Sequence, residues 1–146
     1  GVVSIYTVIT GSAEIKRGSR VTNPNQLVRG GDENYLVVDG YDVELGRPFS
    51  SEESVNGSYV ALVGSDIIND LFDKNEDPIN QKITVLGAKF RIIGKLKEEG
   101  GASGNSNIDR TVIIPMETAR IIAADRNYGF EAAVAVTDPT KMEKAM

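Results

Sequence analysis

A run of acidic and amide side chains at residues 73–77, DKNED, has the D-x-N-x-D spacing of a calcium-binding loop. Such a loop also needs Gly at its sixth position and Glu at its twelfth. This chain has Pro78 and Thr84 at those positions. The favoured interpretation is therefore a polar turn that ends a helix.

A second stretch, Gly100–Gly104, has the glycine content of a phosphate-binding loop. A phosphate loop needs a Lys followed by Ser or Thr after its last Gly, with a helix behind it. Here Asn105-Ser106-Asn107 follows, and the sequence predicts no helix. We therefore expect a surface loop without phosphate chemistry.

Carboxylates gather between residues 32 and 53, with Arg47 as the only basic residue among them. Paired carboxylates can act as acid and base when they converge in a cleft, but a solvated acidic face is the favoured interpretation. The acidic residues are Asp32, Glu33, Asp39, Asp42, Glu44, Glu52 and Glu53. A later segment is basic instead, with Lys82, Lys89, Arg91, Lys95 and Lys97. This charge asymmetry is a weak indication of docking surfaces.

The composition excludes several classes of chemistry. The 146 residues include no Cys, His or Trp, and the net charge is −5. Thiolate catalysis, thiolate zinc sites and the Ser-His-Asp triad are therefore excluded. The acidic balance argues against nucleic acid as a partner.

No segment has the ~18 apolar residues of a membrane span. The start, Gly1–Ser4, has no signal-peptide pattern, and Asp138–Met146 predicts a helix that stops within two turns. We therefore expect a soluble piece of a longer protein.

The hydrophobic pattern predicts an α+β fold with mixed small sheets and two short helices. Tyr59–Val63 is a continuous apolar run, typical of a strand buried on both faces. Asp39–Glu53 has loop composition. The predicted helices are Ser65–Phe72 and Pro115–Ala124, and the other predicted strands are Val2–Ile9, Ala13–Arg17, Gln26–Arg29, Tyr35–Val38, Lys82–Leu86, Lys89–Lys97, Val112–Ile114 and Glu131–Thr137.

The clearest hairpin joins Lys82–Leu86 to Lys89–Lys97. Its second strand alternates with a period of two, which predicts one apolar and one basic face. Phe90, Ile92, Gly94 and Leu96 fall on the apolar face, and Lys89, Arg91, Ile93, Lys95 and Lys97 fall on the outer face.

Six sequence blocks, in a fixed order, resemble one known family. The blocks are Tyr35-Leu36 with Glu44–Ser50, Tyr59–Ser65, Leu71-Phe72, Asp77–Val85, Phe90–Leu96 and Val112–Ala119. Together they resemble the extracytoplasmic core domain of MacB-like permeases of ABC transporters, within the wider FtsX-like family. One departure is Asn80, where Gly is usual. Asn tolerates the same left-handed turn, so we expect the fold to be kept.

The resemblance implies a single extracytoplasmic domain fragment over residues 1–146, with two lobes. Residues 1–19 with 130–146 would form part of a porter-like lobe, and residues 20–129 a small α/β insert. A preceding strand and helix of the porter-like lobe would lie outside this chain.

The resemblance also implies a non-catalytic domain, located in the periplasm and tethered to the membrane in the full protein. It would couple ATP-driven motion to the handling of substrates or partner proteins. It would hold no cofactor itself, because ATP and Mg would be used by a separate nucleotide-binding domain. Its partners would be the rest of the permease, the ATPase and a periplasmic adaptor. The transported substrate, the branch of the family and the oligomeric state stay open. The alternatives are a small carboxylate hydrolase and a ligand-sensing module.

The predicted contact surface for a partner or cargo is the loop Glu98–Arg110 with the basic face that leads into it. The loop has little apolar content, so it adds little to a core, and long loops in compact domains are often functional. A passive surface insertion is the alternative. The candidate contact residues are Lys95, Lys97, Gly100, Gly101, Ser103, Asn105 and Asn107.

Overall fold

The computed structural model describes residues 2–36, 40–99, 107–126 and 133–137, with the backbone alone for 2–5 and 133–137. The α+β class is confirmed. The strands are β1 Val2–Ala13, β2 Ile15–Arg17, β3 Arg20–Val21, β4 Gln26–Gly31, β5 Val43–Gly46, β6 Val60–Val63, β7 Lys82–Val85, β8 Ala88–Leu96, β9 Thr111–Pro115 and β10 Ala133–Thr137. The helices are α2 Ser51–Asn56, α3 Ser65–Leu71, α4 Met116–Asp125 and a 3-10 turn, η1 Ile108–Arg110.

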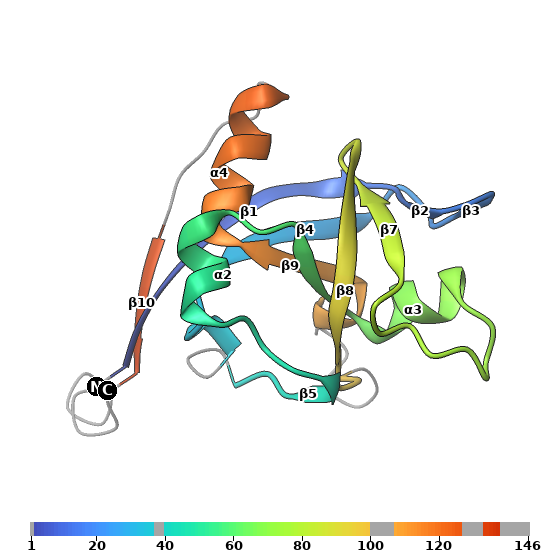
Figure 1. Cartoon of the computed structure of the whole chain (residues 1–146), viewed down its shortest axis with the longest axis horizontal. Coiled ribbons are helices and arrows are strands. Elements are labelled where there is room, and N and C mark those ends of the chain that lie inside the picture. The colour runs from blue at the N-terminus through green and yellow to red at the C-terminus, as the bar shows by residue number, and fades with distance from the viewer. Residues whose placement is uncertain (1, 37–39, 100–106, 127–132, 138–146) are drawn as a thin grey trace.

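Hydrogen bonding joins the described strands into one mixed sheet, where the sequence predicted several small ones. The strand order is β10-β1-β4-β9-β6-β8-β7-β2-β3, and β5 pairs with β8. The pairs β4–β9 and β6–β8 are parallel, and the others are antiparallel. Register shifts interrupt β1 and β8. Such bulges bend a strand, so one strand can serve two differently oriented parts of a sheet. In Figure 1, β10 and the start of β1 form a ribbon that extends from the rest of the sheet.

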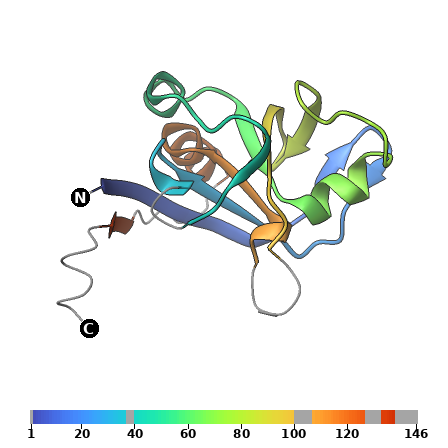
Figure 2. The same ribbon diagram turned by 90° about the horizontal axis from the view of Figure 1, so that it is seen from below.

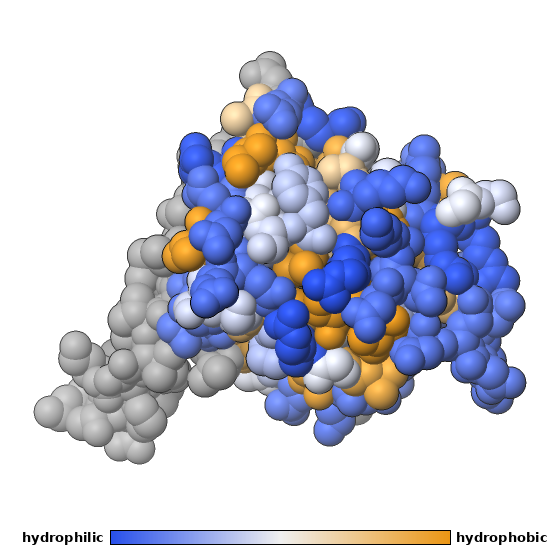
Figure 3. Space-filling model, in the orientation of Figure 1, coloured by the Kyte–Doolittle hydropathy of each residue, from blue (hydrophilic) through white to orange (hydrophobic). Residues whose placement is uncertain are grey.

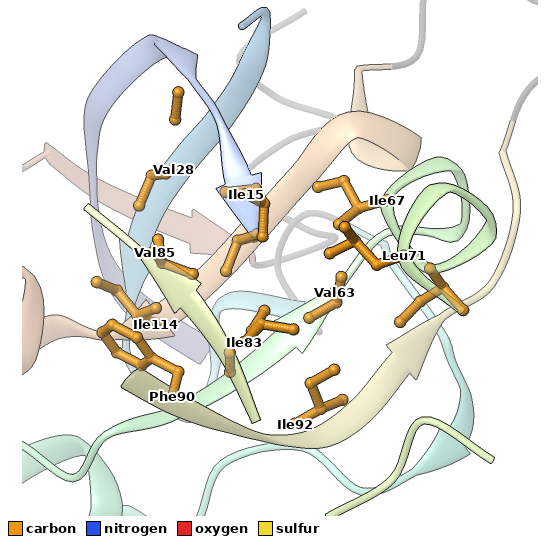
Figure 4. Close-up of a cluster of buried hydrophobic side chains, with 14 of the residues drawn as sticks. Ile15, Val28, Val63, Ile67, Leu71, Ile83, Val85, Phe90, Ile92 and Ile114 are labelled. Carbon is orange, nitrogen blue, oxygen red and sulfur yellow. The ribbon is translucent and has the colours of Figure 1, made fainter. Parts of the chain in front are cut away.

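The first hydrophobic cluster takes its side chains from α3 and α4 and from the strands β1, β2, β4 and β6–β9. Figure 4 shows these side chains pointing toward one another, with Ile67 and Leu71 coming from α3. Phe72, directly after the helix, is only 4% exposed in the same cluster. The predicted burial of the apolar face of this helix is confirmed. Figure 2 shows α3, in bright green, beside the blue strands β2 and β3.

A second hydrophobic cluster lies on the other face of β6. Val60 and Leu62 belong to the second cluster, while Ala61 and Val63 belong to the first. This alternation confirms that β6 is buried on both faces. The other members of the second cluster are Tyr35, Leu36, Phe49, Ile93, Leu96, Ile108 and Ile113.

One face assignment in β8 was wrong. Ile93 was predicted on the outer, basic face, but it is only 2% exposed and packs in the second cluster with Leu96. Ile93 does lie on the opposite face from Ile92, but the second cluster covers that face, so it is not exposed to solvent. The register shift between β6 and β8, where Ala61 pairs with Ile92 but Leu62 pairs with Gly94, then puts Leu96 on the same face as Ile93 instead of the predicted face of Ile92. A bulge breaks the period of two, and a sequence pattern cannot show where this happens.

The segment predicted as an acidic loop contains a strand and a third α-helix. The short strand β5 is held by pairing with β8, and it ends at Gly46, whose φ is 80°. The helix α2 starts with a capping box: the Ser50 hydroxyl accepts from the Glu53 backbone N–H, and the Glu53 carboxylate accepts from the Ser50 N–H. The S-x-x-E spacing is the sequence signal that predicts such a start.

Two sequence-predicted turns are found where expected. The β7–β8 hairpin turns through Leu86 and Gly87, which both have positive φ angles. Asn80 has a φ of 70°, which confirms that Asn adopts the left-handed conformation at the position where Gly is usual. Among the described residues, no helix is long and apolar enough to cross a membrane.

Candidate functional site

The basic side chains of the β7–β8 hairpin form an exposed surface. Lys82, Lys89 and Arg91 are all exposed, and Lys82 lies directly opposite Arg91 in the strand pairing. Arg91 is positioned by a 2.9 Å hydrogen bond to the Asn80 side-chain oxygen. Two like charges opposite one another repel, and an acidic partner would relieve that repulsion.

The candidate contact residues differ in their solvent exposure and in the contacts that they already make. Lys95 is partly buried, and its Nζ pairs with Glu44 at 3.2 Å, so it contributes less to an open surface than predicted. Lys97 is exposed, while its backbone N–H donates to the Asp42 carbonyl. Asn107 is exposed, and its side-chain oxygen accepts from Arg110 at 2.8 Å. The remaining candidates, Gly100, Gly101, Ser103 and Asn105, lie outside the described residues.

The two ends of the predicted loop meet beside the start of α3. The Glu99 backbone N–H donates to the Asp109 carboxylate at 2.9 Å. Gly64 lies close by, and a Cβ there would come within 2.3 Å of the Ile108 carbonyl oxygen. Gly64 has a negative φ, so a close approach between two backbones, rather than a turn, requires glycine here.

Three carboxylates converge beside the start of α3, and no sequence motif predicted this group. Oxygens of Asp66, Glu98 and Asp109 lie within 4.8 Å of one another. Burial, followed by the charges of Asp109, Asp70 and Glu98, raises the pKa of Asp66. Oxygen ligands of this kind suit a divalent cation, but exposed acidic groups are common without one, so we assign no metal to the cluster. The three residues come from three separate segments, so no local spacing could have predicted the group.

Two carboxylates of the acidic stretch 32–53 are engaged in ion pairs. Glu44 pairs with Lys95, and Glu53 pairs with Arg47 at 2.8 Å. The hydrogen bonds from Arg47 lower the pKa of Glu53 to about 2. A general acid at neutral pH needs a raised pKa, so Glu53 is suited to structure rather than to proton transfer. Asp39 lies outside the described residues.

The DKNED stretch forms a polar turn after α3, as predicted. Two of its carboxylates turn to the neighbouring strands: Glu76 pairs with Arg17 at 2.9 Å, and Asp73 pairs with Arg20. Arg17 also lies over the Phe72 ring, 4.1 Å from its centroid. These contacts fasten the turn to β2 and β3, while the Asp77 carboxylate accepts from the Ile79 backbone N–H.

The described residues line several surface hollows. One of about 370 Å³ lies beside this turn and is lined by Leu45, Phe72 and Lys95 among others. Figure 3 shows that hydrophilic residues cover most of the face seen there, with hydrophobic groups exposed between them.

Solved structures share this fold. The periplasmic region of MacB from Actinobacillus actinomycetemcomitans matches with a TM-score of 0.70 and 16% identity, over 97% of this chain and 62% of that chain. The extracellular domain of the noncanonic ABC-type transporter YknZ from Gram-positive bacteria matches with a TM-score of 0.71 and 17% identity, over 97% and 68%. The fold is therefore one that extracytoplasmic domains of ABC transporters adopt.

Sequence comparison gives the family. The model of the MacB-like periplasmic core domain matches residues 2–146, so the chain belongs to that family. The macrolide export ATP-binding/permease protein MacB of Rhodopirellula baltica is 31% identical over 115 residues, 78% of this chain and 16% of that protein. The pyoverdine export ATP-binding/permease protein PvdT of Pseudomonas syringae pv. syringae is 29% identical over 80% of this chain. The chain spans 18% of PvdT, less than a fifth of either relative.

Proposed function

We propose that the chain is the extracytoplasmic domain of an ABC exporter permease and couples ATP-driven membrane motion to substrates or partner proteins outside the cytoplasmic membrane. The family match over residues 2–146 is the observation that supports this most directly. Relatives named as export ATP-binding/permease proteins support the transport role.

The sheet offers a route for such motion. Val2 pairs with Thr137 and Tyr6 with Ala133, so β1 and β10 form a two-stranded ribbon. The same strand β1 continues to Ala13 and pairs with β4 inside the sheet. A displacement of the ribbon would therefore reach the body of the domain through continuous hydrogen-bonded strands.

The domain would work with partners rather than with a cofactor of its own. ATP and Mg would bind a separate nucleotide-binding domain, and the rest of the permease would tether this domain to the membrane. A periplasmic adaptor is the partner that we expect to meet the basic hairpin and the loop after it. The exposed side chains of Lys97 and Asn107, at the two ends of that loop, are the described part of this surface.

The domain is proposed to be non-catalytic, and this can be tested directly. The chain has no Cys or His, and Glu44, Glu53 and Glu76 are engaged in ion pairs. We expect the purified chain neither to bind nor to hydrolyse ATP in the presence of magnesium. Turnover above that of a mock preparation from cells that lack the protein would contradict the proposal.

A further inference from the structure

A hollow on the outer surface of α2 and α4 has an apolar floor and an acidic rim. Figure 1 shows the two helices side by side. The hollow measures about 350 Å³ and lies where the end of β4 meets both helices. It is lined by Asp32, Glu33, Ser54, Val55, Met116 and Glu117.

The floor exposes apolar surface that a partner could cover. Val55 is 71% exposed, although its neighbour Ser54 is buried. The Ser54 hydroxyl has no hydrogen-bond partner among the described residues. Burying Val55 and the half-buried Met116 under an aliphatic side chain would remove apolar surface from water, which favours association.

The rim selects the sign of the partner's charge. Among the residues that the structure describes, three carboxylates line the hollow and no basic side chain does. Glu117 is paired with Arg120, whereas no ion pair joins Glu33 within the part of the chain that the structure describes. An acidic partner would be repelled here, and a lysine or arginine would be attracted.

From this charge complementarity we infer that the hollow binds a basic amphipathic segment of a partner protein. Its Lys or Arg would pair with Glu33 and Asp32, and its neighbouring aliphatic side chain would cover Val55 and Met116. This surface is separate from the basic hairpin, which would attract acidic partners. The inference goes beyond the proposed transport role and does not depend on it.

The test uses the 146-residue chain with a short peptide that alternates lysine and leucine and ends in one tryptophan. The chain has no Trp, so peptide fluorescence reports binding without background. We expect saturable binding, and we expect the matched glutamate–leucine and lysine–serine peptides to bind at least about fivefold more weakly. Equal binding of the glutamate–leucine peptide would contradict the charge assignment, and equal binding of the lysine–serine peptide would contradict the apolar floor.

Variants locate the binding. Asp32→Asn with Glu33→Gln should weaken binding of the lysine–leucine peptide about fivefold, and Val55→Ser should also weaken it. The control, Glu14→Gln with Asp125→Asn, makes the same change in charge away from the hollow. An equal loss in the control would show non-specific attraction to an acidic protein and overturn the inference. Thermal melts confirm that each variant is folded.

Two further readouts separate the other occupants. In amide NMR spectra, the shifts caused by the peptide should fall on residues 31–33, α2 and the start of α4. Shifts centred on Asp66, Glu98 and Asp109 instead would place binding at the other acidic cluster and contradict the inference. Butylammonium should compete only weakly; competition as strong as that of the peptide would indicate a small-cation site and overturn the assignment to a protein segment.

Discussion

The two hydrophobic clusters share β6 but are built in different ways. The first takes its side chains mainly from regular strands and from α3. The second takes Phe49 from a segment between β5 and α2, and Ile93 from the bulge in β8. The first cluster follows from periodicity along the chain, whereas the second depends on special backbone geometry. Substitutions in the first should act through lost packing, and those around the second through backbone strain.

The largest expected loss of stability comes from a substitution in the first cluster. Phe72→Ala should cost roughly 3–5 kcal/mol in the free energy of unfolding, because it leaves a cavity and removes the ring beneath Arg17. Denaturant unfolding measures this, with the exposed Val55→Ala as control, expected within about 0.5 kcal/mol of the parent. A loss below about 1 kcal/mol for Phe72→Ala would contradict the described packing.

The next effect tests the backbone geometry beside the second cluster. At Gly46 the φ of 80° disfavours any side chain, and a Cβ would come within 2.0 Å of the Ile93 carbonyl oxygen. We expect Gly46→Ala to cost roughly 2–3 kcal/mol. The matched control is Gly11→Ala, where a Cβ meets nothing within 4 Å. Equal melting curves for the two variants would show that β5 does not pair with β8 as described.

A smaller effect concerns the start of α2, which follows Phe49 of the second cluster. The pKa of Glu53 is lowered from 4.5 to about 2 by Arg47, so its ionised form stabilises the fold. That contribution is present above the unfolded pKa and is lost as the pH falls from about 4.5 to about 2. Glu53→Gln should cost about 1 kcal/mol at neutral pH and progressively less in acid. A cost that does not change with pH would contradict the ion pair.

The smallest expected change in stability is an increase, and it concerns Asp66. The pKa of Asp66 is raised by burial and by neighbouring carboxylates, so its ionised form destabilises the fold. Below the pKa that Asp66 has in the unfolded chain, the carboxyl is protonated and this destabilisation is absent. The destabilisation develops as the pH rises from that value through the raised pKa of the folded chain. Asp66→Asn should therefore raise the melting temperature at neutral pH and have no effect in acid. Glu14→Gln controls for the change in net charge, and an equal rise there would refute the local cause.

The first cluster was predictable because its signals are local. The apolar run of β6, the spacing of Ile67 and Leu71, and the alternation around Phe90 each lie within one element. The capping box at Ser50 was also a local signal, so α2 could have been predicted from its spacing. The bulge at Ile93 could not, because it depends on the pairing of β8 with another strand.

Neither acidic site was predictable from spacing. Asp66 and Asp109 meet only because η1 packs beside the start of α3. The hollow beside Val55 similarly needs the end of β4 to lie next to two helices that are distant in the chain. The family, in contrast, was predictable, because its six sequence blocks correspond to turns and buried strands of the fold and occur in a fixed order.

The measurement that tests the coupling role most directly uses the full-length transporter with residues 100–107 replaced by a tight turn. ATP hydrolysis, adaptor binding and export are then measured separately on the same preparation. The proposed role predicts that ATP hydrolysis persists while adaptor binding and export fall. If assembly, hydrolysis and export all remain unchanged, the loop is a passive insertion and the contact surface has been assigned to the wrong part of the domain.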